Sequence, residues 1–478
     1  MKDTVSLVGT YYSGKSVLVT GATGFMGKVL VEKLLRSCHD VKSIYICVRP
    51  KGEHSIQTRV QNLLKCKVFD RVREEWPNFH EKIKPISAEF TKPNLAISSE
   101  DMEELLSEVN VIFHCAATVR FDEPLNRDAL LLNVMGTQQL LGLARQMKNL
   151  EALIHVSTAY SNCNRKNIEE VFYPVPVEPK KLLDLVGWMD GSLIEAITPN
   201  LIGDWPNTYT FSKALTEYLI QQEKGDLNVA IVRPSIVGAS WQEPFPGWVD
   251  NFNNINGFLV AAKGVIRTVK CYPTNVADFI PVDLAVNLTI TIETHVRSSF
   301  TQNPLEKPFR IPEVTLTSSH LVHQYRMFVY HTTPAFLYDL YLRLIGKKPQ
   351  AMKLLTRIEK AMRLLEYFIN HTWEWSSGHT NMLMKELNPK DKNLFSFDIR
   401  QVIWSEYLNN YCLGIKKYLL NEDLDGIPAA RQYIRKLKTI NCALKATLLV
   451  IIWLVFIARS QMAHKFLSYI RASSTLRP

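Results

Sequence analysis

The sequence predicts an α/β protein in which a doubly wound parallel sheet is followed by a mainly helical C-terminal domain and a membrane-associated hydrophobic helix. Three observations predict it. Short apolar runs alternate with amphipathic runs over residues 15–295, a glycine-rich turn follows the first apolar run, and an uncharged apolar segment lies near the C-terminus. With 478 residues, 46% of them hydrophobic, the chain is long enough for two or three folded units with cores of their own.

The first element is an apolar run of Val17, Leu18 and Val19, typical of a buried parallel strand. A helix follows the glycine turn, because apolar residues recur at helical spacing up to about residue 37. Strands and helices then alternate. Further strands are expected within 41–50, 81–89, 110–119, 150–160 and 226–237, and further helices within 56–64, 98–109, 125–147 and 207–219. This order predicts helices on both faces of a parallel sheet.

Five segments follow from these patterns. We expect a sheet domain with inserts at 15–295, a linker with an amphipathic helix at 296–350, a helical C-terminal domain at 351–430, a membrane helix at 439–459 and a basic tail at 460–478. A long insert separates Tyr160 from Tyr209, and it could either roof a channel for a substrate chain, together with the aromatic stretch at 240–259, or be a surface loop without that role.

The positive charge is concentrated at the C-terminus. Of the formal net charge of +10, nine Lys and Arg lie between Arg431 and Pro478, where no Asp or Glu occurs, so the first 430 residues carry about +1. This balance argues against a nucleic-acid-binding body. The uncharged run Ala446–Ala458, extended back to Thr439, approaches the length of a membrane span and has basic flanks. Spanning and hairpin insertion both remain open, and the alternative is a buried helix of a globular domain.

The N-terminus has no long apolar stretch, so no signal peptide is expected. The eight cysteines are scattered, without a CxxC pair or a His-Cys ligand spacing. We therefore expect no structural zinc, no other metal site and no disulfide, and a catalytic part that faces the reducing cytosol. The oligomeric state is not predicted.

The glycine-rich turn is the first candidate binding site. Gly21, Gly24 and Gly27 follow the first strand and open a helix, which is typical of a Rossmann-type site where backbone N–H groups hold a pyrophosphate. Thr23, Phe25 and Met26 complete the predicted cofactor-binding turn. The alternative is a tight turn with close helix packing and no nucleotide.

The end of the second strand indicates which dinucleotide is bound. NAD enzymes usually place Asp or Glu there, whereas this chain has Arg49 and Lys51, which favours the 2′-phosphate of NADPH over a solvated surface pair. Ala116 and Ala117 follow a central strand and are small enough for a cofactor to lie above them. His114 is interpreted as a core histidine. Arg120 could bind an acidic substrate group or pair with Asp122.

A tyrosine and a lysine are predicted to carry the chemistry. Tyr209 and Lys213 are one helical turn apart, and an ammonium in that position would favour the phenolate and could bond a nicotinamide ribose. Thr158, with Ser157 as the alternate, would hold the substrate oxygen against the phenol. Together these groups would polarise a carbonyl for hydride attack.

The motifs with these residues resemble the extended short-chain dehydrogenases/reductases. More specifically, "GATGFMGKVLVEKLLRS", "HCAATVRFDEPL", "HVSTAY" and "PNTYTFSKALTE" are similar to fatty acyl-CoA reductases, particularly those of insects, and the resemblance continues to about Asn421. It implies NADPH-dependent reduction of a long-chain acyl-CoA to a fatty alcohol in two hydride transfers, with release of CoA. It also implies a membrane location, and the C-terminal "SSTLRP", which is unlike SKL, favours the endoplasmic reticulum over the peroxisome.

Two other functions remain open at this stage. A membrane-bound relative in the same superfamily could act on a sterol or stop at the aldehyde. A non-catalytic membrane scaffold with a relic fold is the alternative of another class, although the complete set of Thr158, Tyr209 and Lys213 argues against it.

Overall fold

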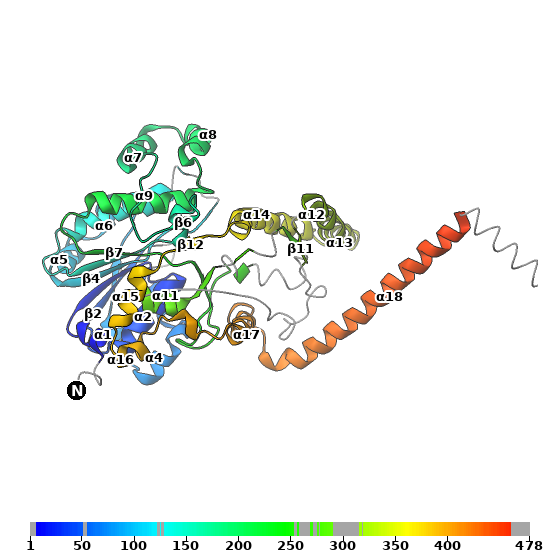
Figure 1. Cartoon of the computed structure of the whole chain (residues 1–478). Coiled ribbons are helices and arrows are strands. Elements are labelled where there is room, and N and C mark those ends of the chain that lie inside the picture. Colours follow the sequence, from blue (N-terminus) through cyan, green and yellow to red (C-terminus); the bar gives the residue numbers. More distant parts are fainter. Residues whose placement is uncertain are drawn as a thin grey trace, which may run out of the picture.

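The computed structural model describes residues 6–50, 55–121, 125, 129–252, 256–257, 268–270, 275–276, 278–289, 315–317 and 319–459. Its centre is a six-stranded parallel sheet in the order β3-β2-β1-β4-β5-β7 (Figure 1). The strands are β1 Ser16–Thr20, β2 Ser43–Val48, β3 Ile83–Ser87, β4 Val109–His114, β5 Ala152–Val156 and β7 Val229–Val232. The predicted fold class is confirmed.

Helices cover both faces of this sheet because successive strand residues point to opposite sides. Val17 and Val19 of β1 pack in the core below helices α2 (Phe25–Ser37) and α11 (Val282–Thr289), and Leu18 packs in the core on the other face. That second face is covered by α5 (Ser99–Glu108), α6 (Gly136–Ala144) and α9 (Thr208–Glu223) (Figure 1). The strand order reverses beside β1, so the crevice at the carboxyl ends of β1 and β4 is the place where such sheets bind nucleotides.

Further helices and short strands surround this core. They are α1 Leu7–Tyr11, α3 Ile56–Leu64, α4 Asp70–Glu75, β6 Asn167–Ile168, α7 Pro179–Trp188, α8 Gly191–Ile202, β8 Ile236–Gly238, β9 Thr268–Lys270, β10 Phe279–Pro281 and β11 Thr315–Thr317. In the insert, Leu182 of α7 and Ile194 of α8 are buried in the same core as Leu215 of α9. The predicted role of the insert as a roof over a substrate channel stays a prediction.

The C-terminal part is helical, with one short strand. Its elements are α12 His320–Met327, the π-helix η7 Phe328–Thr332, α13 Thr333–Leu344, α14 Ala351–Asn370, β12 Glu374–Trp375, α15 Gly378–Glu386, α16 Pro389–Leu394, α17 Trp404–Gly414, the π-helix η9 Ile415–Leu419 and α18 Ile427–Arg459. β12 pairs with β6, and α17 packs against the loop after β8 so closely that a Cβ at Gly414 would lie 1.6 Å from the carbonyl oxygen of Gly247.

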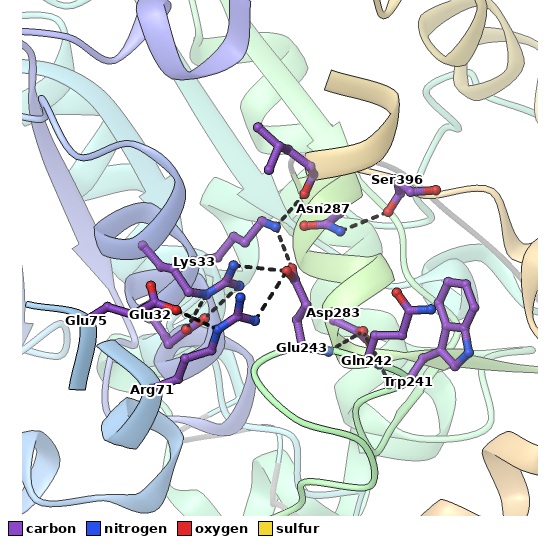
Figure 2. A network of polar contacts seen from close by, with 12 residues as sticks. Glu32, Lys33, Arg71, Glu75, Trp241, Gln242, Glu243, Asp283, Asn287 and Ser396 are labelled. Atoms are coloured by element: carbon purple, nitrogen blue, oxygen red, sulfur yellow. Dashed lines mark hydrogen bonds and ion pairs between the residues drawn. The ribbon is translucent and has the colours of Figure 1, made fainter. Parts of the chain in front are cut away.

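A buried ionic network fastens the C-terminal part to the sheet domain (Figure 2). Lys33 of α2 is 2% exposed and donates to Glu243 and to the backbone carbonyl of Leu394, each at 2.5 Å. Arg36 reaches the other oxygen of Glu243 at 2.9 Å and pairs with Glu32 one turn away at 2.7 Å. Burial alone would raise the pKa of Glu243, but Lys33 and Arg36 hold it below its usual range.

Helix α18 contains the predicted membrane segment 439–459 and extends away from the sheet domain (Figure 1). Residues Leu424–Val455 are long and apolar enough to cross a membrane, and the large apolar side chains at 448–455 are about half exposed or more. The basic tail 460–478 lies outside the described residues.

Candidate active site

Two of the three glycines in the turn after β1 are required by sterics. Gly21 has a φ of +73°, and a Cβ there would lie 2.7 Å from the backbone nitrogen of Ala116. A Cβ at Gly27 would lie 2.2 Å from the carbonyl oxygen of Gly21. Residues larger than glycine would therefore separate α2 from the turn and from β4. Thr23 lies in the turn between these two glycines.

The N-terminus of α2 fits the phosphates of a dinucleotide. Gly24 is its N-cap, no side chain caps it there, and its first turn contains no acid, so its N–H groups and dipole favour an anion. Phe25 and Met26 would contribute only backbone groups to phosphate binding, because their side chains pack into the core. The ring of Phe25 stacks on Trp248 with centroids 5.3 Å apart, and Met26 packs beside it against the α17 core.

A buried hydrogen-bond chain fixes the end of β4. The N–H of Ala116 donates to Thr20 Oγ1 at 3.1 Å, and the Thr20 hydroxyl donates to His114 Nδ1 at 2.7 Å. On the other side, His114 Nε2 lies 2.9 Å from Thr137 Oγ1, whose proton goes to the carbonyl of Asn133. These roles leave the imidazole neutral, and burial lowers its pKa to about 3. His114 is a structural residue, and the half-buried Ala116 and Ala117 follow it at the crevice.

The structure brings Tyr209 and Thr158 together. Thr158 follows β5, Tyr209 lies in the first turn of α9 behind the N-cap Asn207, and the Thr158 hydroxyl is close enough to the phenol to act on its pKa. Burial raises the pKa of Tyr209 to about 12, and only part of this rise is offset by Thr158. The expectation that Lys213 makes this phenol acidic is wrong. At neutral pH the phenol keeps its proton, which is the form required of a general acid.

Lys213 points to the sheet instead of the phenol. Its Nζ donates to the carbonyl of Val156 at 2.8 Å, and burial lowers its pKa to about 8, although the carboxylate of Glu217 opposes this change. The ammonium therefore holds α9 against the end of β5, because Val156 is the last residue of that strand and directly precedes Ser157 and Thr158. This contact depends on the fold and could not be found from the spacing to Tyr209.

Ser157 is not available as the alternate to Thr158. Its hydroxyl donates to Glu217 at 2.5 Å, and the same carboxylate forms an ion pair with Arg233 at 2.7 Å. Glu217 was missed by sequence reasoning, although it lies one helical turn beyond Lys213, at the same spacing that separates Lys213 from Tyr209.

Asn133 is a second residue that the sequence did not reveal. It lies in a π-helical turn before α6, is 2% exposed, and accepts the N–H of Thr118 at 2.9 Å while it donates to Ser212 at 2.9 Å. It therefore joins the loop after β4 to the helix that carries Tyr209. An isolated Asn in an apolar run gives no sequence signal for such a role.

Arg49 lies directly after β2, and its side chain is exposed at the same edge of the sheet as the glycine turn. Its backbone carbonyl accepts a hydrogen bond from the guanidinium of Arg59, which places a second cation beside it. Lys51 and Asp122 lie outside the described residues, so the predicted contribution of Lys51 and the proposed pair between Arg120 and Asp122 stay predictions.

No metal-binding group of three or more His, Cys, Asp or Glu side chains occurs among the described residues. The crevice instead combines a helix N-terminus suited to phosphate with the pair of Tyr209, at the start of α9, and Thr158, at the end of β5. This fold and site define the class: a nicotinamide-dependent oxidoreductase of the extended short-chain dehydrogenase/reductase type.

Solved reductase domains share the fold. The terminal R domain of the myxalamid pathway has a TM-score of 0.51 at 19% identity, with 84% of this chain and 90% of that one covered. The reductase domain of a non-ribosomal peptide synthetase from Mycobacterium tuberculosis has a TM-score of 0.51 at 17% identity, covering 87% and 95%.

Sequence comparison identifies the particular family. Two family models, both described as male sterility protein, match residues 19–289 and 330–422. Fatty acyl-CoA reductase 1 of Homo sapiens is 53% identical over 98% of this chain and 99% of its own length, and the Gallus gallus protein of the same name has the same identity and coverage. Fatty acyl-CoA reductase 2 of Mus musculus is 52% identical over 99% and 100%. The chain belongs to the fatty acyl-CoA reductase family.

Proposed function

We propose that this protein reduces long-chain fatty acyl-CoA to the fatty alcohol and consumes two NADPH for each thioester. The proposal is carried by one observation: Tyr209, whose raised pKa keeps the phenol protonated, lies beside Thr158 at the sheet edge that also holds the glycine turn. The names of the relatives support the thioester substrate. A bound nicotinamide would supply hydride twice, first to the thioester carbon and then to the aldehyde.

Side chains of this protein would position the substrate carbonyl oxygen and supply its proton. Thr158 Oγ1 would hydrogen-bond the substrate carbonyl oxygen and hold it at the phenol. In the first reduction this stabilises the charge that develops on oxygen until the carbon–oxygen double bond re-forms, the carbon–sulfur bond breaks and CoA leaves as the thiolate, which takes a proton from water. In the second reduction Tyr209 would give its proton to the oxygen of the aldehyde, which yields the alcohol. Lys213 would hold α9 against β5 so that the two hydroxyl groups stay together.

We infer that NADPH is preferred over NADH. Arg49 is exposed at the end of β2, where a 2′-phosphate would lie, and Arg59 supplies a second cation close to it. Gly21, Thr23, Gly24 and Gly27, with the backbone of the first turn of α2, would hold the pyrophosphate.

Membrane attachment through α18, with the catalytic part in the cytosol and the endoplasmic reticulum as the membrane, completes the proposal. The described cysteines are all free thiols, as expected in a reducing compartment. Protease digestion of sealed microsomes should cleave the catalytic part, and imaging beside a reticulum marker tests the location. Protection from protease would contradict this orientation.

The activity is tested with microsomes that contain the full chain, palmitoyl-CoA and NADPH, with alcohol and aldehyde measured by gas chromatography. Tyr209→Phe should lower alcohol formation by about 10²- to 10⁴-fold, the usual contribution of a general acid, with little change in NADPH binding. Tyr218→Phe, on the same helix but away from Thr158, is the matched control and should keep full activity. Accumulation of aldehyde by the native chain would mean that the reaction stops after one hydride transfer.

A further inference from the structure

A cavity of about 450 Å³ lies between helix α14, helix α12 and the π-helix η7. Its apolar wall is formed by Met327 and Phe328 on one side and by Leu355, Ile358, Met362 and Ile369 of α14 on the other. The volume is within the range of natural ligand sites, and methionines allow such a wall to adapt to flexible apolar ligands.

Charged side chains in the wall are paired with one another. Lys270 forms an ion pair with Glu366 at 2.7 Å, and Arg363 lies 3.7 Å from Glu359. These four groups therefore contribute no net charge to the cavity. An uncharged apolar chain suits this lining better than an anionic headgroup, because no unpaired cation among these four is offered to an anion.

Helix α14 connects this cavity to Tyr209. The ring of Phe121 lies between them, with its centroid 5.6 Å from that of Tyr209 and 5.2 Å from that of Phe368. Phe368 precedes Ile369, which lines the near end of the cavity, whereas Leu355 lines it one helix length away. At 1.5 Å per residue, the wall from Ile369 to Leu355 is about 20 Å long. One acyl chain spans about 15 Å, half of a bilayer core, so a long chain that starts at Tyr209 and passes Phe121 and Phe368 reaches into this wall from the Ile369 end.

We propose that this cavity holds the hydrocarbon tail of the acyl substrate and sets its chain-length preference. The proposal rests on the proposed function. The thioester would lie at Thr158 and Tyr209, the first methylenes beside Phe121 and Phe368, and the remaining methylenes along α14 toward Leu355. Side chains at Ile358 and Met362 face the middle of this path and decide how much of the tail fits.

Met362→Trp fills the middle of the cavity and tests this assignment. Each methylene that can no longer be buried should cost about fourfold in kcat/KM, so the loss of three would lower kcat/KM for palmitoyl-CoA by roughly 60-fold. Activity with octanoyl-CoA should persist within about twofold, since a short tail ends before Met362. The matched control is Ala361→Trp, which introduces the same indole side chain at the adjacent, exposed position outside the cavity lining and should leave turnover of both substrates unaffected.

The outcomes distinguish a failure of the cavity assignment from a failure of the proposed reductase function. If the native chain reduces no acyl-CoA, the proposed function fails. If the native chain is active and Met362→Trp keeps the native ratio of palmitoyl-CoA to octanoyl-CoA turnover, the cavity assignment is overturned. If Met362→Trp loses both activities, Met362→Ala, which widens the cavity, decides: a shift in preference toward longer acyl-CoA supports the assignment, and an unchanged preference overturns it.

A separate surface of the C-terminal part is rich in exposed apolar side chains. Helices α12 and α13, with η7 between them, expose large apolar and aromatic side chains, which we call the aromatic platform: Leu321, Val322, Tyr325, Phe328, Tyr330, Phe336, Leu337, Tyr338, Leu340, Tyr341, Leu344 and Ile345. Within the described residues 319–348 the one acid is Asp339, and it is buried where it accepts N–H groups at the start of α14. The exposed cations Arg343, Lys347 and Lys348 follow the platform.

We infer that the aromatic platform lies in the lipid-water interface of the membrane that α18 enters. Exposed tyrosines and phenylalanines with lysines and arginines at the rim, and without exposed carboxylates, match the chemistry of that interface. Helices α12 and α13 lie together, beside α14 and away from the sheet (Figure 1), so the platform can contact a bilayer without covering the glycine turn. Phe328 belongs both to the platform and to the cavity wall.

Full-length protein in phosphatidylcholine-phosphatidylserine vesicles, with a diazirine on the phospholipid acyl chain, tests this contact. Mass spectrometry should find lipid adducts on peptides from 336–345 as well as on α18. Trp188, which is 74% exposed on α7, is the matched control and should stay unlabelled. Adducts on α18 alone would overturn the inference.

Discussion

The network around Glu243 predicts a large loss of stability on Glu243→Gln. Glu243 is the partner of two buried cations, Lys33 at 2.5 Å and Arg36 at 2.9 Å, with side chains 2% and 6% exposed (Figure 2). Arg36 keeps a second partner in Glu32 at 2.7 Å. Among the described residues, Lys33 would keep the carbonyl of Leu394 as its hydrogen-bond acceptor, so its charge would be left in the core without a directly paired carboxylate.

The size of this loss follows from the proton that Lys33 can release. In the native chain burial already lowers the pKa of Lys33, even though Glu243 opposes this effect. Without Glu243, the variant can fold with a neutral lysine. Releasing the proton at a pH of about 7.4 from a group with an unfolded pKa of about 10.4 costs about 4 kcal/mol, which is the upper limit of the loss. Because the carbonyl of Leu394 and the new amide remain, we expect about 2 to 4 kcal/mol, close to that of other broken buried pairs.

The sign of the pH dependence is fixed by the same reasoning. The unfolded variant binds one more proton than the folded variant, so its stability should rise with pH, by up to about 1.4 kcal/mol per pH unit, until Lys33 is also neutral in the unfolded chain near a pH of about 10.4. Native protein should gain less over the same range, because Glu243 favours the protonated Lys33.

The assay is thermal unfolding of the detergent-solubilised full chain, followed by tryptophan fluorescence. A loss of 4 kcal/mol corresponds to about 4 °C in Tm if the whole chain unfolds together, and to more if the sheet domain unfolds alone. Glu108→Gln is the matched control, because Glu108 pairs with Lys42 at the surface, where such pairs contribute about 0.5 kcal/mol or less. The reasoning is refuted if both variants lose the same stability, or if the Tm of Glu243→Gln relative to native does not rise with pH.

Three other predictions concern the site. Because burial lowers the pKa of Lys213 to about 8, its ammonium is lost as pH rises through that value, and kcat/KM measured from about pH 6 to about pH 10 should fall above about pH 8; a flat profile would contradict this. Gly27→Ala should abolish NADPH binding, measured by quenching of tryptophan fluorescence, since the new Cβ would lie 2.2 Å from the carbonyl oxygen of Gly21, and binding at native affinity would refute the steric argument. Arg49→Glu should raise KM for NADPH by about 10- to 100-fold, the contribution of a charge-assisted phosphate bond, with KM for NADH little changed, and an equal rise for both cofactors would exclude a 2′-phosphate contact.

Much of the sheet domain could be predicted from sequence because its rules are local. Apolar runs of strand length alternate with runs of helical period, and this order specifies a parallel sheet covered on both faces. The glycine turn was predictable for the same reason, since Gly21 and Gly27 meet across one turn of chain. The pairing of Thr158 with Tyr209 was predictable in outline, because both lie where strands and helices begin or end at one edge of the sheet.

The electrostatics of the site could not be predicted in this way. The spacing of Tyr209 and Lys213 suggested a cation beside a phenol, yet Lys213 donates to Val156 and the phenol is a weaker acid than free tyrosine. A pKa depends on burial and on the direction of each side chain, and both depend on contacts with β5, more than fifty positions away. For the same reason the sequence left Ser157 open as the alternate to Thr158, whereas the structure shows that the hydroxyl of Ser157 donates to Glu217.

By itself, the sequence determined the class of fold, the glycine turn and the residues from which the chemistry is built, because these follow from periodicity, chain stiffness and side-chain size over a few neighbouring positions. Tertiary structure alone decided that Glu243 joins Lys33 from 210 positions away, that Tyr209 keeps its proton, and that α12, η7 and α14 enclose a cavity. Burial and long-range contacts arise only when distant segments pack together, and no local pattern encodes them.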